Sequence, residues 1–195
     1  MKEKIYLIPG LMTDVRLWSR ITPFLDEYEL VHLPIPHSSN FDEILDMLVD
    51  SFKEEKVNLL GFSLGGYIAS YFAVKYPHRV NRLFMVAATP GASDKSEIER
   101  RKEKFAVIEK EGFKGLPYEK AVSLVEKQNQ EDIELITIIQ DMFMDLGKET
   151  FISQLTSTFN RIDLLEDLVR LSVGLNLPIW FYYSDNDRLL NHKAI

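Results

Sequence analysis

Hydrophobic residues recur with two different periods along the first half of the chain. Short apolar runs rich in β-branched and aromatic residues predict strands at 4–9, 29–36, 56–62 and 80–89. Between them, residues 13–28, 40–56 and 64–79 carry apolar positions at helical spacing. Thr13 or Asp14 is the expected N-cap of the first of these helices, and Asn40 that of the second. Alternation of strand and helix predicts a parallel sheet flanked by helices.

The pattern changes after residue 92. Helical patterns fill 96–112, 118–128, 130–147 and 147–160, with Gly112 and Gly147 as expected helix ends, and no convincing strand occurs before about residue 171. A β pattern returns in "LPIWFYYSD" at 177–185. We therefore expect an α/β core made of residues 1–91 and 172–195, interrupted by a helical cap insertion at 92–171.

Composition narrows the function classes. With 46% hydrophobic and 27% charged residues, the 195-residue chain is typical of a folded domain. A net charge of −7 disfavours nucleic acid as a partner. The absence of cysteine excludes disulfides and thiol catalysis and suits a cytoplasmic protein. No apolar run approaches the ~20 residues of a membrane helix, the N-terminus is too short for a signal peptide, and no metal or nucleotide motif predicts a cofactor.

The stretch "GFSLGG" at 61–66 carries the candidate chemistry. A serine on a sharp turn between a strand and a helix adopts a strained backbone, and its hydroxyl stands above the carboxyl edge of the sheet. Glycines two positions before and after it, Gly61 and Gly65, avoid collisions within the turn, and Gly66 lets the helix pack closely. Ser63 is therefore a candidate nucleophile.

Beyond this turn, the chain resembles the α/β-hydrolase family, and among its members small bacterial serine hydrolases with a Leu-Pro-Gly-Leu loop. The resembling segments are "LIPGLMTDVRLW", "GFSLGGYIA", "YPHRVNRLFMVAATPGA", "GKETFISQLTSTFNRIDLLEDL" and "LPIWFYYSDNDRLLN". Many relatives have His-Gly in the first segment, where this chain has Pro9-Gly10. The likeness spans essentially the whole chain.

The resemblance implies a role for each site residue. Ser63 would be the nucleophile, and the backbone N–H groups of Leu11 and Leu64 would bind the developing oxyanion. The loop "SDNDRLLN" would supply the acid of a catalytic triad. Asp187 is the favoured acid and Asp185 the fallback.

The histidine base is the missing part of this pattern. In this fold the base follows the acid, and only eight residues follow Asp187, including His192. His32, His37 and His78 precede the acid and read as surface or core histidines. We therefore expect the natural chain to continue past Ile195, with the last strand, the base and the closing helix missing here. The segment "IWFYY" at 179–183 would then be an open sheet edge, which invites a homodimer.

The expected activity is cleavage of a carboxylic ester, thioester or lactone of a small apolar substrate through an acyl-enzyme on Ser63. The alternatives are a lyase or C–C bond hydrolase on the same fold, or a catalytically degenerate binding protein. The roof of the substrate pocket would come from apolar residues of the cap, although ordinary packing within the cap is the competing explanation for each. These residues are Met142, Phe143, Met144, Phe151, Leu155 and Phe159.

Overall fold

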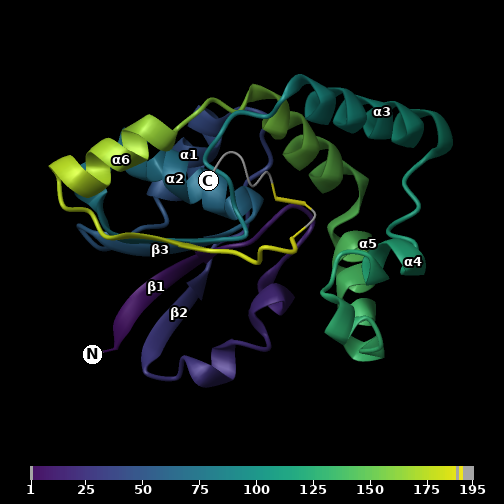
Figure 1. Cartoon of the computed structure of the whole chain (residues 1–195), viewed down its shortest axis with the longest axis horizontal. Coiled ribbons are helices and arrows are strands. Elements are labelled where there is room, and N and C mark those ends of the chain that lie inside the picture. Colours follow the sequence, from purple (N-terminus) through teal and green to yellow (C-terminus); the bar gives the residue numbers. More distant parts are fainter. Residues whose placement is uncertain (1, 188, 191–195) are drawn as a thin grey trace.

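The computed structural model describes residues 2–187 and 189–190. It contains a five-stranded, entirely parallel sheet with the strand order β2-β1-β3-β4-β5 (Figure 1). The strands are β1 (Glu3–Ile8), β2 (Tyr28–His32), β3 (Val57–Phe62), β4 (Val80–Val86) and β5 (Ile179–Tyr182). The parallel sheet predicted from the sequence is confirmed.

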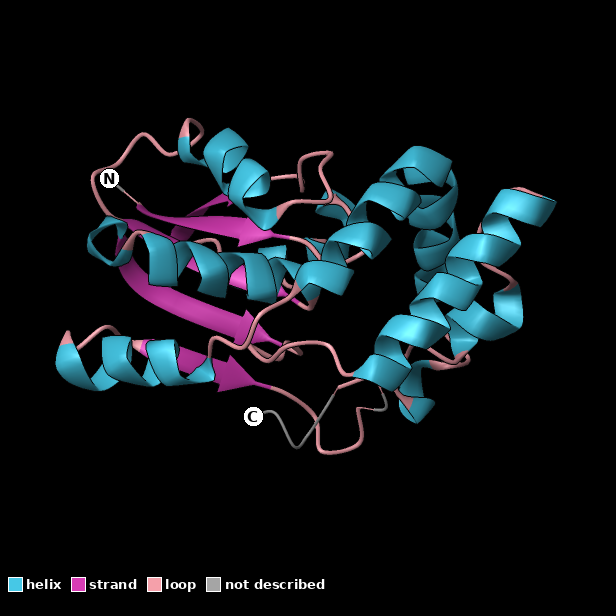
Figure 2. Ribbon diagram, turned by 90° about the horizontal axis from the view of Figure 1, so that it is seen from above, coloured by secondary structure: helices cyan, strands magenta, loops and turns pink. Residues whose placement is uncertain are grey.

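One face of the sheet is covered by α1 (Phe41–Val49), α2 (Leu64–Lys75) and α6 (Leu165–Gly174) (Figure 2). Helix α2 lies between the other two and packs on β1, β3 and β4. The side chain of Asn40 caps α1 by accepting a hydrogen bond from the amide of Asp42. The buried side chains of these helices and of the sheet form one hydrophobic core. This core holds the turn at the start of α2 in place.

Three helices follow β4 in the chain and precede α6: α3 (Lys95–Glu111), α4 (Tyr118–Val122) and α5 (Ile133–Ser157). They lie beyond the carboxyl ends of the strands, toward which the arrowheads in Figure 2 point. Gly147 has φ +73° and divides α5 into two helical parts, where the sequence predicted one helix to end and another to begin. Helix α6 packs on α2, although it begins within 92–171, and the boundaries expected for the insertion stay a prediction.

The helix expected over 13–28 is wrong. The segment forms two short 3₁₀ helices, Val15–Trp18 and Thr22–Phe24, and Asp14 caps the first of them. Pro23 cannot donate the hydrogen bond that an α-helix needs and would clash with the preceding turn. Of the apolar residues that suggested the helix, only Trp18 is fully buried, so packing offers little to offset that cost.

The other face of the sheet is less covered. Phe84, Trp180 and Tyr182 are 38%, 44% and 69% exposed, and β5 is the edge strand in the described part of the chain. The self-pairing expected for this edge stays a prediction. None of the helices among the described residues has the length and hydropathy to span a membrane.

Candidate functional site

Ser63 occupies the turn between β3 and α2. Its backbone has φ +52° and ψ −115°, a combination that L-residues adopt only under constraint. The amide of Ser63 donates to the carbonyl of Val86 at the end of β4 (2.9 Å), and the Ser63 carbonyl accepts from Tyr67 in the first turn of α2 (3.2 Å). These bonds hold the half-buried serine at the carboxyl edge of the sheet.

The glycines around Ser63 are required by close backbone approach. A Cβ atom on Gly61 would lie 2.6 Å from the Cα of Gly66, and one on Gly65 would lie 2.6 Å from the carbonyl carbon of Ile8. A Cβ on Gly66 would overlap the side chain of Ala88. The strand, the helix and the loop after β1 therefore meet at separations that no larger residue allows.

The loop after β1 lies directly beside the serine. Ile8 pairs with Gly61 in the sheet, and a Cβ on Gly10 would lie 3.2 Å from the Cβ of Ser63. Leu11 follows Gly10, and its amide donates no hydrogen bond within the described residues. Leu64 is the first residue of α2, so its amide has no partner inside the helix. Both predicted oxyanion donors thus belong to segments that adjoin Ser63.

Backbone strain is concentrated at this edge. Among the described non-glycine residues, Met12, Ser63 and Ala87 have φ of +56°, +52° and +46°, and they follow β1, β3 and β4. Asn176, at +52°, lies elsewhere, after α6. Such conformations cost on the order of 1–3 kcal/mol each and tend to cluster at functional sites. The sequence carries no signal for Met12 or Ala87.

The loop after β5 reaches the same edge. The amide of Ala87 donates to the carbonyl of Tyr182 (2.8 Å), so β5 ends level with β4, and β4 lies between β5 and β3. Asp187 is half-buried, and its Oδ1 accepts a hydrogen bond from the amide of Leu189 (2.9 Å). Asp185 is exposed. The structure therefore places the expected acid loop two strands, or about 10 Å, from the strand that carries Ser63.

The three described histidines lie apart from one another. His78 lines an open cleft of about 590 Å³ at the amino edge of the sheet, opposite Ser63. His37 Nε2 is 3.3 Å from the hydroxyl of Thr150 in α5. His32, at the end of β2, is half-buried, and burial lowers its pKa although the charge of Asp14 opposes the shift. His192 lies outside the described residues.

The helices beyond the sheet contact the loop after β1. The side chain of Met12 is fully buried and packs with Phe151 and Leu155 of α5, with Leu11, Phe143 and Phe159 around them. Met142 is buried too, and its sulfur lies 3.4 Å from the amide of Asp14. Met144 is 57% exposed. Most of the apolar residues expected over the site are thus directed at the loop beside Ser63.

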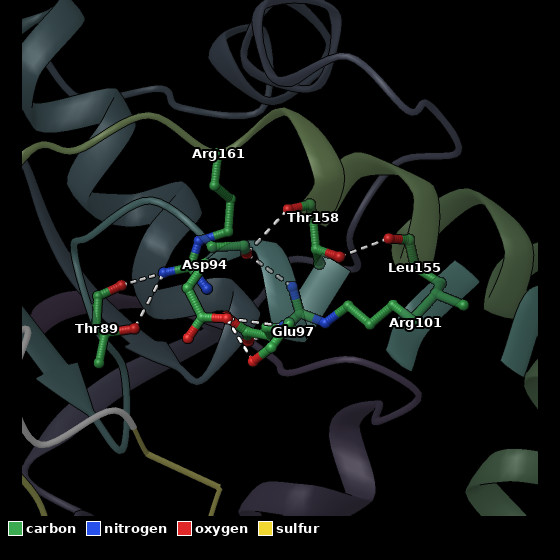
Figure 3. Close-up of polar contacts among 9 residues, drawn as sticks. Thr89, Asp94, Glu97, Arg101, Leu155, Thr158 and Arg161 are labelled. Carbon is green, nitrogen blue, oxygen red and sulfur yellow. Dashed lines mark hydrogen bonds and ion pairs between the residues drawn. The ribbon is translucent and has the colours of Figure 1, made fainter. Parts of the chain in front are cut away.

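Polar contacts fasten this insertion to the end of β4 (Figure 3). Arg161 bonds the carbonyl and the hydroxyl of Thr89 and lies 4.2 Å above the ring of Tyr67. Burial lowers the pKa of Arg161 to about 10, so the guanidinium stays charged near neutral pH. Arg101 of α3 donates to Ser93 (2.8 Å), whose hydroxyl in turn donates to the carbonyl of Thr158 (3.1 Å). The contacts of Arg161 thus join the insertion to α2 and to the segment after β4, and the bonds of Ser93 join α3 to the end of α5 within the insertion.

Comparison with known proteins agrees with this geometry. The family model described as alpha/beta hydrolase fold matches residues 5–124, which include the loop after β1, the turn at Ser63 and the whole of β4. The chain belongs to the α/β-hydrolase family. Among solved structures, this α/β-hydrolase is similar to a hydrolase from Pseudomonas aeruginosa PA01, with a TM-score of 0.75 and 17% identity over 99% of this chain and 76% of that one. It is also similar to an enol-lactonase from Burkholderia xenovorans LB400, with a TM-score of 0.72 and 14% identity over 99% of this chain and 86% of that one.

Curated relatives are more similar in sequence but match over a smaller part. A 2-succinyl-6-hydroxy-2,4-cyclohexadiene-1-carboxylate synthase from Enterobacter sp. (strain 638) is 31% identical over 110 residues, covering 51% of this chain and 43% of that protein. A pimeloyl-[acyl-carrier protein] methyl ester esterase from Vibrio campbellii is 30% identical over 95 residues, covering 44% of this chain and 37% of that protein. The chain thus matches less than half the length of either relative. Esterases and hydrolases are among the homologues of this α/β-hydrolase.

Proposed function

We propose that this α/β-hydrolase cleaves a carboxylic ester, thioester or lactone of a small apolar substrate through an acyl-enzyme on Ser63. The observation that carries the proposal is the strained backbone of Ser63, held at the carboxyl edge by glycines that no larger residue can replace. A costly conformation at a serine on this edge of the sheet is best explained by the need to present its hydroxyl to a substrate.

The roles follow from the chemistry of acyl transfer. The Ser63 oxygen attacks the substrate carbonyl carbon while a histidine takes the hydroxyl proton, and the carbonyl oxygen becomes negative. The amides of Leu11 and Leu64 donate hydrogen bonds to that oxygen. The protonated histidine gives its proton to the leaving alcohol or thiol, and water then releases the acid by the same steps. Asp187 orients the histidine, which we assign to none of His32, His37 and His78.

The apolar side chains over the loop suggest the substrate class. Leu11, Phe143 and Phe159 are partly buried apolar side chains at the margin of the cluster that Met12, Phe151 and Leu155 form, and they present carbon rather than charge. A small apolar acyl or alcohol group is the ligand that such a surface favours, and no metal or organic cofactor is needed for the steps above.

The test is covalent labelling and turnover by the full-length protein. We expect a fluorophosphonate probe to label wild-type protein, and short-chain p-nitrophenyl esters to be hydrolysed. Ser63→Ala should abolish labelling and lower kcat by roughly 10⁴-fold or more, because it removes the nucleophile. Ser51→Ala, at an exposed serine just after α1, is the matched control and should leave both unchanged. Wild-type protein that neither labels nor turns over would support a degenerate binding protein instead.

A lyase or C–C bond hydrolase is the second candidate, because one relative is a 2-succinyl-6-hydroxy-2,4-cyclohexadiene-1-carboxylate synthase, 31% identical over 110 residues. The same variants separate the two. Labelling of Ser63 without any ester turnover would favour this second chemistry, whereas ester turnover that disappears in Ser63→Ala favours the first.

A further inference from the structure

The two peptide groups on either side of Leu11 are both held by side chains. The Gly10 carbonyl accepts hydrogen bonds from the amide (3.3 Å) and the hydroxyl (3.0 Å) of Thr13. Since a peptide group is planar and trans, the N–H of Leu11 points away from that carbonyl. Thr13 therefore sets the direction of the amide that we assign to the oxyanion.

The next peptide is held from the insertion. The amide of Met12 donates to Oε1 of Gln154 at 2.8 Å, across 142 residues of sequence. Both partners are buried, Gln154 at 4% exposed and Met12 at 0%. Met12 also has the strained φ of +56°. A buried hydrogen bond to a strained backbone amide is difficult to replace. If it is lost, that amide has neither a protein group nor a water molecule to accept its hydrogen bond.

We propose that Gln154 is a positioning residue, which holds the oxyanion loop in its productive geometry from the helical insertion. The proposal rests on the proposed function, in which the amide of Leu11 is an oxyanion donor. Gly10 packs against Ser63, so movement of the loop also changes the distance between donor and nucleophile. A displacement of about 1 Å in such a site costs on the order of 100-fold in rate. The insertion thereby contributes to the chemical step as well as to the pocket wall.

The experiment replaces the acceptor and keeps the shape of the side chain. Gln154→Met in the full-length protein should lower kcat for a p-nitrophenyl ester by roughly 10- to 100-fold, with KM changed less than about threefold. Binding of a boronic acid that mimics the tetrahedral intermediate should weaken by a similar factor. Gln140→Met is the matched control, since Gln140 lies in the same helix but donates to the carbonyl of Leu116 (2.9 Å). It should leave kcat unchanged.

A second variant gives a readout that a purely structural role would not produce. Gln154→Glu keeps an oxygen acceptor, and burial should raise the pKa of the new carboxyl. Once ionised, this carboxyl would repel the charge that develops on the substrate oxygen. We expect the ratio of variant to wild-type kcat to fall as the pH rises from 5 to 9, by about tenfold between its two limits. This variant also carries the test if Gln154→Met does not fold.

The outcomes separate the two proposals. If Ser63→Ala is inactive but Gln154→Met, folded by circular dichroism, keeps kcat within about threefold of wild type, the role of Gln154 is overturned and the hydrolase survives. The role of Gln154 is likewise overturned if the ratio of Gln154→Glu kcat to wild-type kcat does not change between pH 5 and 9. If Ser63→Ala retains wild-type turnover, the proposed function itself fails, and the role of Gln154 fails with it.

Discussion

The turn that carries Ser63 and the loop that carries Asp187 lie at one edge of the sheet and are built in opposite ways. Around Ser63, backbone atoms of β1, β3 and α2 approach so closely that a Cβ on Gly61 or Gly65 would overlap them. Around Asp187, its amide donates to the carbonyl of Ser184 and its carboxylate accepts from the amide of Leu189, while the hydroxyl of Ser184 donates to Glu126 (2.9 Å). One segment is fixed by close backbone packing in the core, and the other is a loop held by hydrogen bonds around a half-buried carboxylate.

The difference follows from what each residue does in the proposed mechanism. A nucleophile in a strained conformation must be over-determined by its surroundings, or the strain would relax. An acid that only orients a base needs a defined position but no strain, so a loop suffices. Substitutions should therefore affect the two segments differently. Those in the loop should lower activity with little change in the free energy of unfolding, whereas those at the glycines of the turn should lower the free energy of unfolding.

The largest expected effect is at the acid. Asp187→Asn in the full-length protein should lower kcat by about 10⁴-fold, because the neutral amide no longer holds the histidine in the right tautomer. The free energy of unfolding, measured by urea titration, should change by no more than about 1 kcal/mol, because asparagine has the same shape and its side-chain oxygen can still accept from the amide of Leu189. Steady-state turnover of a p-nitrophenyl ester measures the first effect.

Asp185→Asn is the control for this prediction, because Asp185 lies two residues away and is exposed. It should keep kcat within about twofold of wild type, since surface substitutions away from the site rarely matter. The opposite result, with the loss at Asp185, would transfer the role to that residue and leave the contrast between the two segments intact. A loss of stability at Asp187 comparable to that expected in the turn would remove the contrast.

The next effect is at the turn. Gly65→Ala would place a methyl group against the backbone carbonyls of Ile8, the last residue of β1, and of Pro9, the first residue after it. We expect the free energy of unfolding to fall by about 3 kcal/mol or more, since overpacking at a rigid site is costly. Gly174→Ala is the control: a Cβ there meets nothing within 4 Å, and alanine should stabilise α6 by about 0.5–1 kcal/mol. A Gly65→Ala protein as stable as wild type would mean that the turn is not sterically fixed.

Much of this arrangement could be predicted from the sequence, because it is encoded locally. Each predicted strand is a short apolar run, three of them stopped by Pro9, Pro34 or Pro90, and "GFSLGG" combines a nucleophile with the residues that its turn requires. The break at Gly147 was predictable for the same reason, since a glycine with φ +73° ends a helical segment at little cost. Local steric rules act over a few residues, which a sequence pattern can express.

The remainder depends on contacts between distant segments. Residues 13–28 have helical spacing, but the tertiary structure buries only Trp18 of the apolar positions, and Pro23 decides the outcome. The strain at Met12 and the bond from its amide to Gln154 exist only because α5 lies against the loop after β1. No periodicity or motif marks such a pair, so the residue that we propose to position the oxyanion loop became visible only in the structure.

The smallest effect concerns pH. Tyr67, one turn after Ser63, is fully buried and exchanges hydrogen bonds with the backbone of Ile162, at 3.1 Å to the carbonyl and 2.8 Å from the amide. Burial raises the pKa of Tyr67 from 10.0 to about 12. Above pH 10 the unfolded chain therefore loses this proton while the folded one keeps it, and stability falls by up to about 1.4 kcal/mol per pH unit until about pH 12.

Tyr67→Phe removes this proton and also the two bonds to Ile162. Below pH 10 the variant should be less stable than wild type by about 1–3 kcal/mol, because the Ile162 amide and carbonyl lose their buried partner. From pH 10 toward 12 the gap should narrow, since only wild type has the tyrosine to titrate. Ile68→Val is the control, because Ile68 is the next residue of α2, is equally buried and has no ionisable group. The difference in free energy of unfolding between this variant and wild type, measured by urea titration at each pH, should stay constant. If the difference in free energy of unfolding between Tyr67→Phe and wild type is also independent of pH, the hydroxyl ionises as easily in the folded protein as in the unfolded chain. The start of α2 would then be less rigid than the glycine contacts around Ser63 imply.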